Sequence, residues 1–196
     1  MSKKRAPQLP KQSAQVPAST PAKQADQNSE RVQRLVSEGA RLLEAKRPGE
    51  AIVKLAEAWA LDSQNAAVAI NLGGAYILQG KHDLAIPVLE KALLLEPDNV
   101  MVWSNLAASY LGKLPLASSE RQQKAILAYE RALALDARAP HVHYNLGLIY
   151  LERDDPLRAA SHFYSALVTD PNDRDARYWL DKIQEGAHTD RAPYQD

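Results

Sequence analysis

The chain has 196 residues, of which 45% are hydrophobic, so it is long enough to form an ordinary domain with a sizeable core. Its 24 Lys and Arg residues balance its 24 Asp and Glu residues, so net charge does not favour nucleic acid or an acidic membrane as a partner. The absence of Cys excludes disulfides, thiolate catalysis and cysteine-based zinc sites. Because no run has signal-peptide length or approaches the roughly 18 apolar residues of a membrane span, we expect a soluble, cytoplasmic protein.

Residues 1–30 are predicted to form a disordered N-terminal tail. Gln, Pro, Ala, Ser and Lys dominate this segment, and after the initial Met its only large apolar side chains are Leu9 and Val16. Such a segment cannot bury enough apolar surface to offset the entropy lost on ordering. It carries five Lys or Arg and two Asp or Glu, a net charge of +3. We interpret its basic start, residues 3–5, as solubilising rather than as a site for nucleic acid or lipid.

The body of the chain, residues 31–186, is predicted to be all-α. Ala, Leu, Glu, Lys and Arg dominate it, apolar residues recur at helical spacing, and no alternating β-branched run appears. The body contains an internal repeat of 34 residues: "AAVAINLGGAYILQGKHDLAIPVLEKALLLEPDN" at 66–99 and "PHVHYNLGLIYLERDDPLRAASHFYSALVTDPND" at 140–173. A weaker copy occupies 32–65, and a copy with six inserted residues occupies 100–139.

These copies share a set of small and aromatic residues in register. The set is Leu72, Gly73, Tyr76, Ala85, Leu89, Ala92 and Pro97 in one copy, and Leu146, Gly147, Tyr150, Ala159, Phe163, Ala166 and Pro171 in the other. Over residues 32–173 this pattern resembles the tetratricopeptide repeat (TPR) family, although Ser63 and Ala137 replace the terminal Pro and only Trp103 keeps the early Trp. The resemblance implies a right-handed helical solenoid of about four helix-turn-helix repeats.

Several residues mark the expected helix ends. We expect a helix from Ala67 to Gln79 that stops at Gly80. Asp83 is predicted to cap the next helix, with Pro87 close to its first turn. In the fourth repeat, Asp155-Pro156 is typical of a cap followed by Pro at the first helical position.

A capping helix is predicted at 174–186, followed by a flexible tail at 187–196. Apolar residues fall on one face of this helix and polar residues on the others; they are Ala176, Leu180 and Ile183 against Arg177, Asp181 and Gln184. Such a helix covers the end of a repeat array.

The insertion falls within residues 111–124. Ser119 followed by Gln122 fits a capping box, so the second helix of the third repeat is expected to start early. The remaining residues, around 114–116, form a longer loop that carries apolar side chains. We favour a loop that tucks over the edge of the solenoid, with a lid or contact site as the alternative.

The chain shows no catalytic constellation, so we expect no enzyme, no cofactor and no metal site. The common hydrolase, nucleotide and zinc motifs are absent. His141 and His143 are two residues apart on a helix and therefore face different ways, so they cannot jointly hold an ion. His143 is interpreted as a core residue, and His82 and His162 have no ligand partners at suitable spacing.

In the TPR family, the first helix of each repeat lines a concave groove. Carried over to this chain, the groove positions are Val36, Ala40, Leu43, Ile70, Gly74, Ile77, Met101, Ser104, Ala108, Leu111, His141, Tyr144, Leu148 and Leu151. Most are apolar and charges are nearly missing, which indicates a binding surface. The alternative is that some are buried between helices or under the N-terminal tail.

Asn71, Asn105 and Asn145 occupy one equivalent position beside this apolar band. An Asn amide offers a donor and an acceptor that match a peptide backbone, so one Asn per repeat would form a ladder along an extended peptide. The alternative is that the amides bond only within the scaffold. The family's other mode, a Lys/Arg clamp on a C-terminal carboxylate, is not expected: of that pattern only Asn71 is present, and Val36, Ala40, Met101 and Asn105 hold the other positions.

The sequence therefore predicts a non-catalytic interaction module or adaptor. It would bind an extended peptide or a helix of a partner protein in its groove, without nucleic acid or membrane. The alternative is a structural or assembly role, through self-association by the insertion or by the C-terminal helix with Trp179. The sequence leaves the oligomeric state open.

Overall fold

The computed structural model describes residues 21–189, and within them every regular element is helical. The elements are α1 (Pro21–Glu44), α2 (Pro48–Leu61), α3 (Ala66–Leu78), α4 (His82–Leu95), α5 (Val100–Leu111), the 3-10 helix η1 (Leu114–Leu116), α6 (Ser119–Leu135), α7 (Val142–Glu152), α8 (Pro156–Thr169) and α9 (Arg174–Thr189). The all-α prediction is confirmed for this part of the chain.

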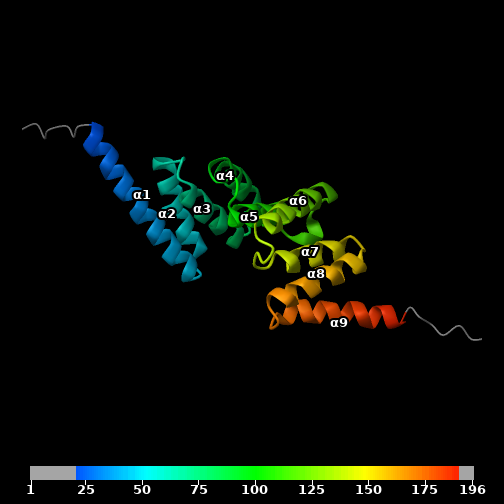
Figure 1. Ribbon diagram of the computed structural model, residues 1–196. Coiled ribbons are helices and arrows are strands. Elements are labelled where there is room, and N and C mark those ends of the chain that lie inside the picture. The colour runs from blue at the N-terminus through cyan, green and yellow to red at the C-terminus, as the bar shows by residue number, and fades with distance from the viewer. Residues whose placement is uncertain (1–20, 190–196) are drawn as a thin grey trace, which may run out of the picture.

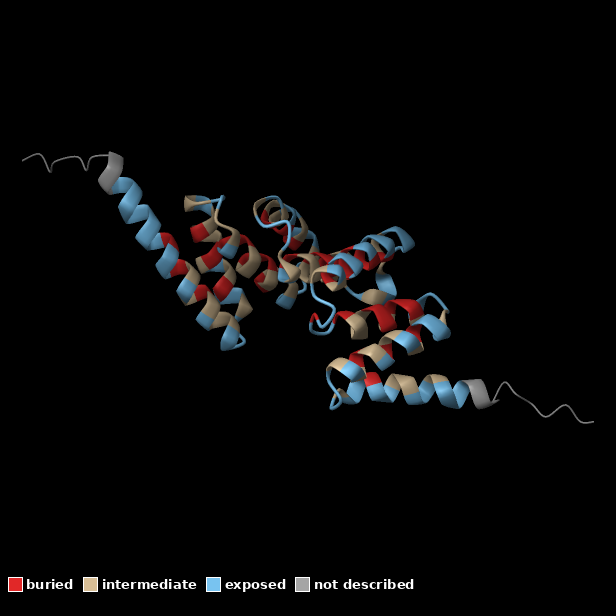
Figure 2. Ribbon diagram, viewed as in Figure 1, coloured by how far each residue is buried: buried red, intermediate tan, exposed pale blue. Residues whose placement is uncertain are grey.

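Successive helices form pairs that stack along one direction. Figure 1 shows α1 at one end and α9 at the other, with the pairs α3–α4, α5–α6 and α7–α8 between them. Each helix packs mainly on its chain neighbours, and α3 also packs on α1 and α5. Within the described residues, the buried side chains lie between successive helices, in small clusters from α1 to α5 and in one larger cluster from α5 to α9 (Figure 2). Such an array is stabilised repeat by repeat through contacts between neighbours.

Glycines let the two helices of a pair approach closely. A methyl group built on Gly39 would lie 2.6 Å from Leu55, and one on Gly73 would lie 2.5 Å from Leu89. A methyl group on Gly147 would lie 2.6 Å from the ring of Phe163. The small residues of the repeat are therefore explained by helix-to-helix distance.

The N-terminal prediction was wrong for residues 21–30, which belong to α1. Pro21 starts the helix, a position that tolerates Pro, and no further Pro or Gly interrupts the segment up to residue 38. Val32 and Leu35 are buried and anchor the helix, so extending it backwards is cheaper than nucleating a new one. Residues 1–20 lie outside the described part of the chain.

At the other end, α9 meets the expectation for a capping helix. Its apolar face holds the buried Ala176, with Leu180 and Ile183 packed against the same core. The polar positions Arg177 and Asp181 are exposed. Residues 187–189 continue α9 instead of starting a tail, and residues 190–196 lie outside the described part.

Two of the predicted caps differ in outcome. Asp155 caps α8 as predicted, because its carboxylate accepts a hydrogen bond from the Arg158 N–H at 3.0 Å and Pro156 follows it. Asp83 does not cap α4: Lys81 is the cap residue, without a side-chain bond, and Asp83 lies in the first turn. Pro87 sits inside α4, further along than predicted.

The insertion lengthens α6 and adds η1. α6 has 17 residues against 14 in α4, so its early start is confirmed. The cap is Ser118 rather than Ser119; its hydroxyl accepts from the Arg121 N–H at 3.3 Å. The buried Gln122 instead donates to the Ala117 carbonyl at 3.2 Å. In η1, Leu114 packs against the core and Leu116 is exposed, so the loop only partly tucks onto the array.

The array is irregular between α6 and α7. Asn65, Asn99 and Asp173 cap α3, α5 and α9, but the equivalent position before α7 is the buried Ala139. Without that cap α7 begins later, at Val142. His141 then takes a left-handed conformation with φ of 60°. α7 packs mainly on α8 and less on α6 and η1, and no packing comparable to that of α3 on α5 joins it to α5.

Candidate functional site

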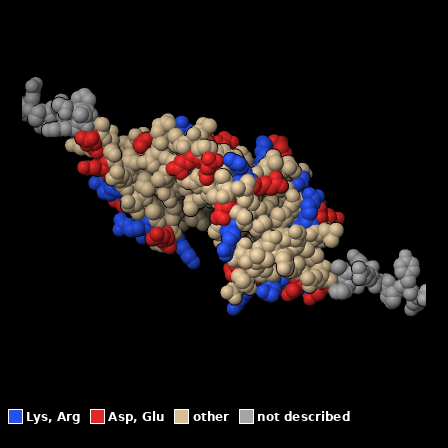
Figure 3. Space-filling view, viewed as in Figure 1, with Lys and Arg blue, Asp and Glu red and all other residues tan. Residues whose placement is uncertain are grey.

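The predicted groove positions lie on α1, α3, α5 and α7, except for His141, which precedes α7. In Figure 3 the surface is hollowed between the part formed by α1 to α5 and the part formed by α7 to α9. Met101 and His141 are exposed. The partly buried positions are Val36, Ala40, Leu43, Ile70, Gly74, Ile77, Ser104, Ala108, Tyr144, Leu148 and Leu151. Leu111 is only 8% exposed and packs in the core, so it offers a partner little surface.

The three Asn side chains do not form one continuous row. Asn71 donates to the Ala67 carbonyl of its own helix at 2.9 Å. The Asn105 amide nitrogen on α5 lies 4.0 Å from the position of a methyl group built on Gly74, which is about one turn after Asn71 on α3. Asn145 lies on α7, beyond the irregular junction. Asn105 therefore faces α3 near Asn71, whereas Asn145 lies on a helix that has no comparable packing on α5.

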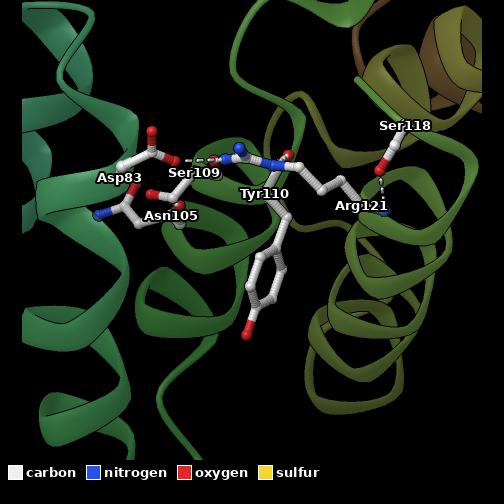
Figure 4. A network of polar contacts seen from close by, with 6 residues as sticks. All are labelled: Asp83, Asn105, Ser109, Tyr110, Ser118 and Arg121. Carbon is white, nitrogen blue, oxygen red and sulfur yellow. Dashed lines mark hydrogen bonds and ion pairs between the residues drawn. The ribbon is translucent and has the colours of Figure 1, made fainter.

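A cluster of polar contacts connects the C-terminal end of α5 to α4 and α6 (Figure 4). The Arg121 guanidinium on α6 donates to the carbonyls of Tyr110 and Ser109 at 2.8 and 3.2 Å, and to Asp83 on α4 at 2.9 Å. A cation at the C-terminal end of a helix satisfies free carbonyls and the helix dipole. The Ser109 hydroxyl donates to the Asn105 carbonyl at 2.8 Å. Arg121, which stands where Arg47 and Lys81 stand in the first two repeats, therefore fixes the end of the helix that carries Asn105.

His143 and His162, which the sequence analysis did not pair, are in contact in the fourth repeat. The Nδ1 atoms of His143 and His162 are 3.1 Å apart, so one ring donates and the other accepts. Tyr150 stacks on His162 with a 5.4 Å centroid distance, and the Arg158 guanidinium lies over Tyr150. The equivalent pair in the second repeat, Ala69 and Val88, also packs in one cluster. The repeat frame therefore contained the signal that pairs these two positions.

Acid is expected to destabilise this repeat. Burial lowers the pKa of His143, and burial together with the neighbouring His143 and Arg158 lowers the pKa of His162. A lowered folded-state pKa means that the unfolded chain binds more protons, so stability is fully present above the unfolded pKa of about 6.5 and falls as pH drops below it. His162→Phe should therefore reduce the loss of unfolding free energy between neutral pH and about pH 5, as measured by urea unfolding.

The control for this experiment is the third perturbed histidine. Burial also lowers the pKa of His82, mainly through desolvation, so part of the acid dependence should survive in His162→Phe. A His82→Gln variant separates the two contributions. An acid slope unchanged by His162→Phe would contradict the assignment.

Trp179 on α9, which the sequence analysis named only for self-association, occupies the next equivalent position of the row. Trp179 stands 34 residues after Asn145, so the repeat frame placed it at the Asn position of the next helix. Burial raises the pKa of Tyr144, Trp179 acts in the opposite direction, and Asp175 and Asp173 add to the rise. Tyr178 packs edge-on to Trp179 at 5.3 Å. The far end of the row is thus aromatic with nearby carboxylates.

Neither a metal-binding cluster nor a membrane-spanning helix is present within residues 21–189. No three His, Cys, Asp or Glu side chains within them are grouped to hold a metal ion. None of the helices in residues 21–189 combines the length and apolar character needed to cross a bilayer.

Family models decide the classification. Residues 42–109 match a model described as tetratricopeptide repeat, and residues 116–153 match one described as TPR repeat. The chain belongs to the tetratricopeptide repeat family. Together the two matches cover more than half of the chain, in agreement with the paired helices of the fold.

Individual relatives of this TPR chain differ widely in length. It is 32% identical over 105 residues to a peroxisomal targeting signal receptor of Candida albicans, which is 54% of this chain but 17% of that receptor. The chain thus spans less than a fifth of the length of the curated relatives it matches.

Solved structures show the fold alone. MamA of Desulfovibrio magneticus RS-1 is 22% identical with a TM-score of 0.63, covering 73% of this chain and 77% of the other. PilF of Pseudomonas aeruginosa is 21% identical with a TM-score of 0.69, covering 83% and 71%.

Proposed function

We propose that this TPR chain is a non-catalytic adaptor that binds an extended peptide of a partner protein along α3, α5 and α7. The observation that supports the proposal is the placement of Asn105 against Gly74 of α3, about one turn from Asn71, beside apolar side chains that a solvated helix face would not favour. The similarity to a targeting signal receptor agrees with a binding role. A cytoplasmic location remains a prediction from the sequence.

The apolar neighbours would supply affinity and the amides orientation. Ile70 and Ile77 on α3, with Met101 on α5, offer apolar surface next to the amides. The bond from Asn71 to Ala67 uses one amide N–H, so it does not engage the side-chain carbonyl or the second N–H. Those groups match the donors and acceptors of a peptide backbone.

The proposed route to self-association through the insertion or the C-terminal helix finds less support. Leu114 of the insertion and Trp179 of α9 both pack against the core of the chain itself. These two side chains are therefore poorly placed to contact a second molecule, whereas Leu116 of the insertion is exposed. We prefer the adaptor role.

The proposal is tested by selecting peptides from a display library on the full chain and measuring their affinity by fluorescence anisotropy. Changing Asn71, Asn105 and Asn145 together to Ala should weaken binding roughly tenfold to hundredfold, because each lost hydrogen bond costs about 0.5–1.5 kcal/mol. Asn71→Ala with Asn105→Ala should account for most of the loss.

Two controls locate the site. Asn172→Ala, an exposed amide in the α8–α9 loop, should leave affinity unchanged. Met101→Asp places a charge on an exposed apolar position of the row and should weaken binding without unfolding the chain. Selected peptides that tolerate both the triple Asn change and Met101→Asp would contradict binding at this surface.

A further inference from the structure

A pocket of about 220 Å³ lies where the insertion meets the turn between α3 and α4. Gly80 and His82 line one side of it, and Gly112, Lys113 and Arg121 line the other. Gly112 ends α5 with a φ of 57°, and a methyl group built on it would lie 3.6 Å from the His82 ring. The six inserted residues have no counterpart in the other repeats, so this wall of the pocket is particular to the third repeat.

The His82 ring presents a hydrogen-bond donor to the pocket. Its Nδ1 atom is buried, and it is the only buried side-chain N or O atom within residues 21–189 that has no hydrogen-bond partner. The other ring nitrogen, Nε2, makes no hydrogen bond either, but it is not buried in this way and reaches solvent at the pocket. Buried N–H groups without an acceptor are rarer than buried acceptors without a donor, so the neutral ring carries its proton on Nε2.

The surroundings of His82 keep the ring neutral near pH 7. Burial has the largest effect and lowers the pKa of His82, and Arg121 and Lys113 lower it further, whereas Asp83 acts in the opposite direction. The ring therefore offers an uncharged Nε2–H between two cations.

Two cations and a helix start add further donors. Lys113 is exposed and has no ion pair or hydrogen bond in the described part of the chain. Arg121 uses its Nε and Nη2 atoms for two carbonyls of α5 and for Asp83, which leaves Nη1. The cap residue of α4, Lys81, makes no side-chain hydrogen bond, so the first N–H groups of that helix lack a side-chain acceptor. An uncapped helix start favours an anion.

Asp83 is the only carboxylate in the lining, and it limits the charge of a ligand. It pairs with Arg121 at 2.9 Å, and its side chain is 83% exposed. With His82 neutral, the positive charges of Lys113 and Arg121 and the negative charge of Asp83 leave the pocket with one net positive charge. A ligand with a single negative charge balances it, whereas a phosphate dianion would leave an excess. A carboxylate has one charge and accepts hydrogen bonds without donating any, so it matches the donors as well.

We propose that this pocket binds a carboxylate group, which accepts hydrogen bonds from the Lys113 ammonium, the His82 Nε2–H and the uncapped start of α4. Charge-assisted hydrogen bonds of this kind are stronger than neutral ones. A free organic acid and an acidic side chain of a partner protein offer the same group. Leu116 lines the pocket and is 80% exposed, so an apolar contact with a neighbouring residue favours the protein side chain. The site does not depend on the peptide groove, because none of these residues is a groove position.

NMR of the His82 ring during titration tests the site on the full chain. The probes are acetyl-Gly-Glu-Gly-amide, its Gln counterpart and sodium acetate, at constant ionic strength. The Glu peptide should shift the ring signals saturably, with a Kd in the millimolar range, and the Gln peptide should not. The bound carboxylate should also raise the pKa of His82, because a nearby negative charge favours the charged ring. Equal shifts by the Glu and Gln peptides, or no saturable shift up to about 20 mM, would overturn the proposal.

The acetate titration separates the two sources of the carboxylate. Acetate that binds more weakly than the Glu peptide would support a side chain of a partner protein. Acetate that binds equally well would support the carboxylate site but overturn the preference for a protein ligand.

Two further measurements locate the group. Lys113→Gln should weaken binding of the Glu peptide by about fivefold or more. Lys91→Gln, which removes the same charge about 13 Å further along α4, should leave binding unchanged. Equal weakening by both changes would indicate a diffuse attraction to basic residues. In the free chain, ¹⁵N shifts should place the His82 proton on Nε2; a proton on Nδ1 would present an acceptor to the pocket. Either result would overturn the proposed site.

Discussion

Phe163→Ala is expected to lower the free energy of unfolding by about 3–5 kcal/mol, the range for deleting a fully buried aromatic side chain. Phe163 is 0% exposed and lies against Gly147, whose missing side chain gives the ring its place. Its ring also packs 5.9 Å from the ring of Tyr144. With Gly opposite, no neighbouring side chain fills the space that the change leaves, so a cavity remains. Urea unfolding followed by circular dichroism measures the loss.

Tyr164→Ala is the matched control for this change. Tyr164 is the next residue along α8, about 100° further around the helix, and is largely exposed. Its removal should change the unfolding free energy by no more than about 0.5 kcal/mol. A loss below about 2 kcal/mol for Phe163→Ala would mean that α7 and α8 collapse into the vacated space.

The repeat pattern was sufficient to predict the fold, because the residues that recur in it are the same residues that pack the two helices of each pair. Gly73 and Leu89, or Gly147 and Phe163, recur at one spacing because two helices at one distance need them. The misassigned ends have local causes. Pro87 was expected near a helix start, but α4 begins at His82 and continues past it.

Contacts between elements were harder to read from the sequence. His143 and His162 are 19 positions apart, and only the alignment of two helices brings their rings together. The burial of Leu111 follows from the insertion, which has no counterpart in the other repeats. A groove residue predicted from the family's repeat pattern can therefore be buried where an insertion interrupts that pattern.

The candidate site was predicted as a row of equivalent positions, but equivalence in sequence does not ensure continuity in space. Asn71 and Asn105 lie on helices that pack together. Asn145 follows Ala139, which lacks the capping side chain of Asn65 and Asn99, and α7 has no packing on α5 comparable to that of α3 on α5. One missing cap therefore changes the geometry of the row without changing its sequence pattern.

Gly73→Ala is expected to destabilise the chain by about 1–3 kcal/mol, the usual cost of overpacking a filled core. The added methyl would lie 2.5 Å from a methyl group of Leu89, which is 0% exposed and has no free space to turn into. Ala has the higher helix propensity, by about 1 kcal/mol, so the packing term has to exceed that gain. Thermal unfolding of the two chains side by side gives the difference.

The neighbouring glycine separates packing from propensity. Gly74→Ala adds the same methyl to the same helix, but the nearest atom is the Asn105 amide nitrogen at 4.0 Å. It should stabilise the chain by about 0.5–1 kcal/mol, so the two variants move in opposite directions. Ala107 occupies the position of Gly73 in α5, which shows that a helix pair can accommodate a methyl there. Equal stabilisation by both changes would mean that α3 and α4 move apart to admit the methyl group at residue 73. The expected packing cost would then be absent.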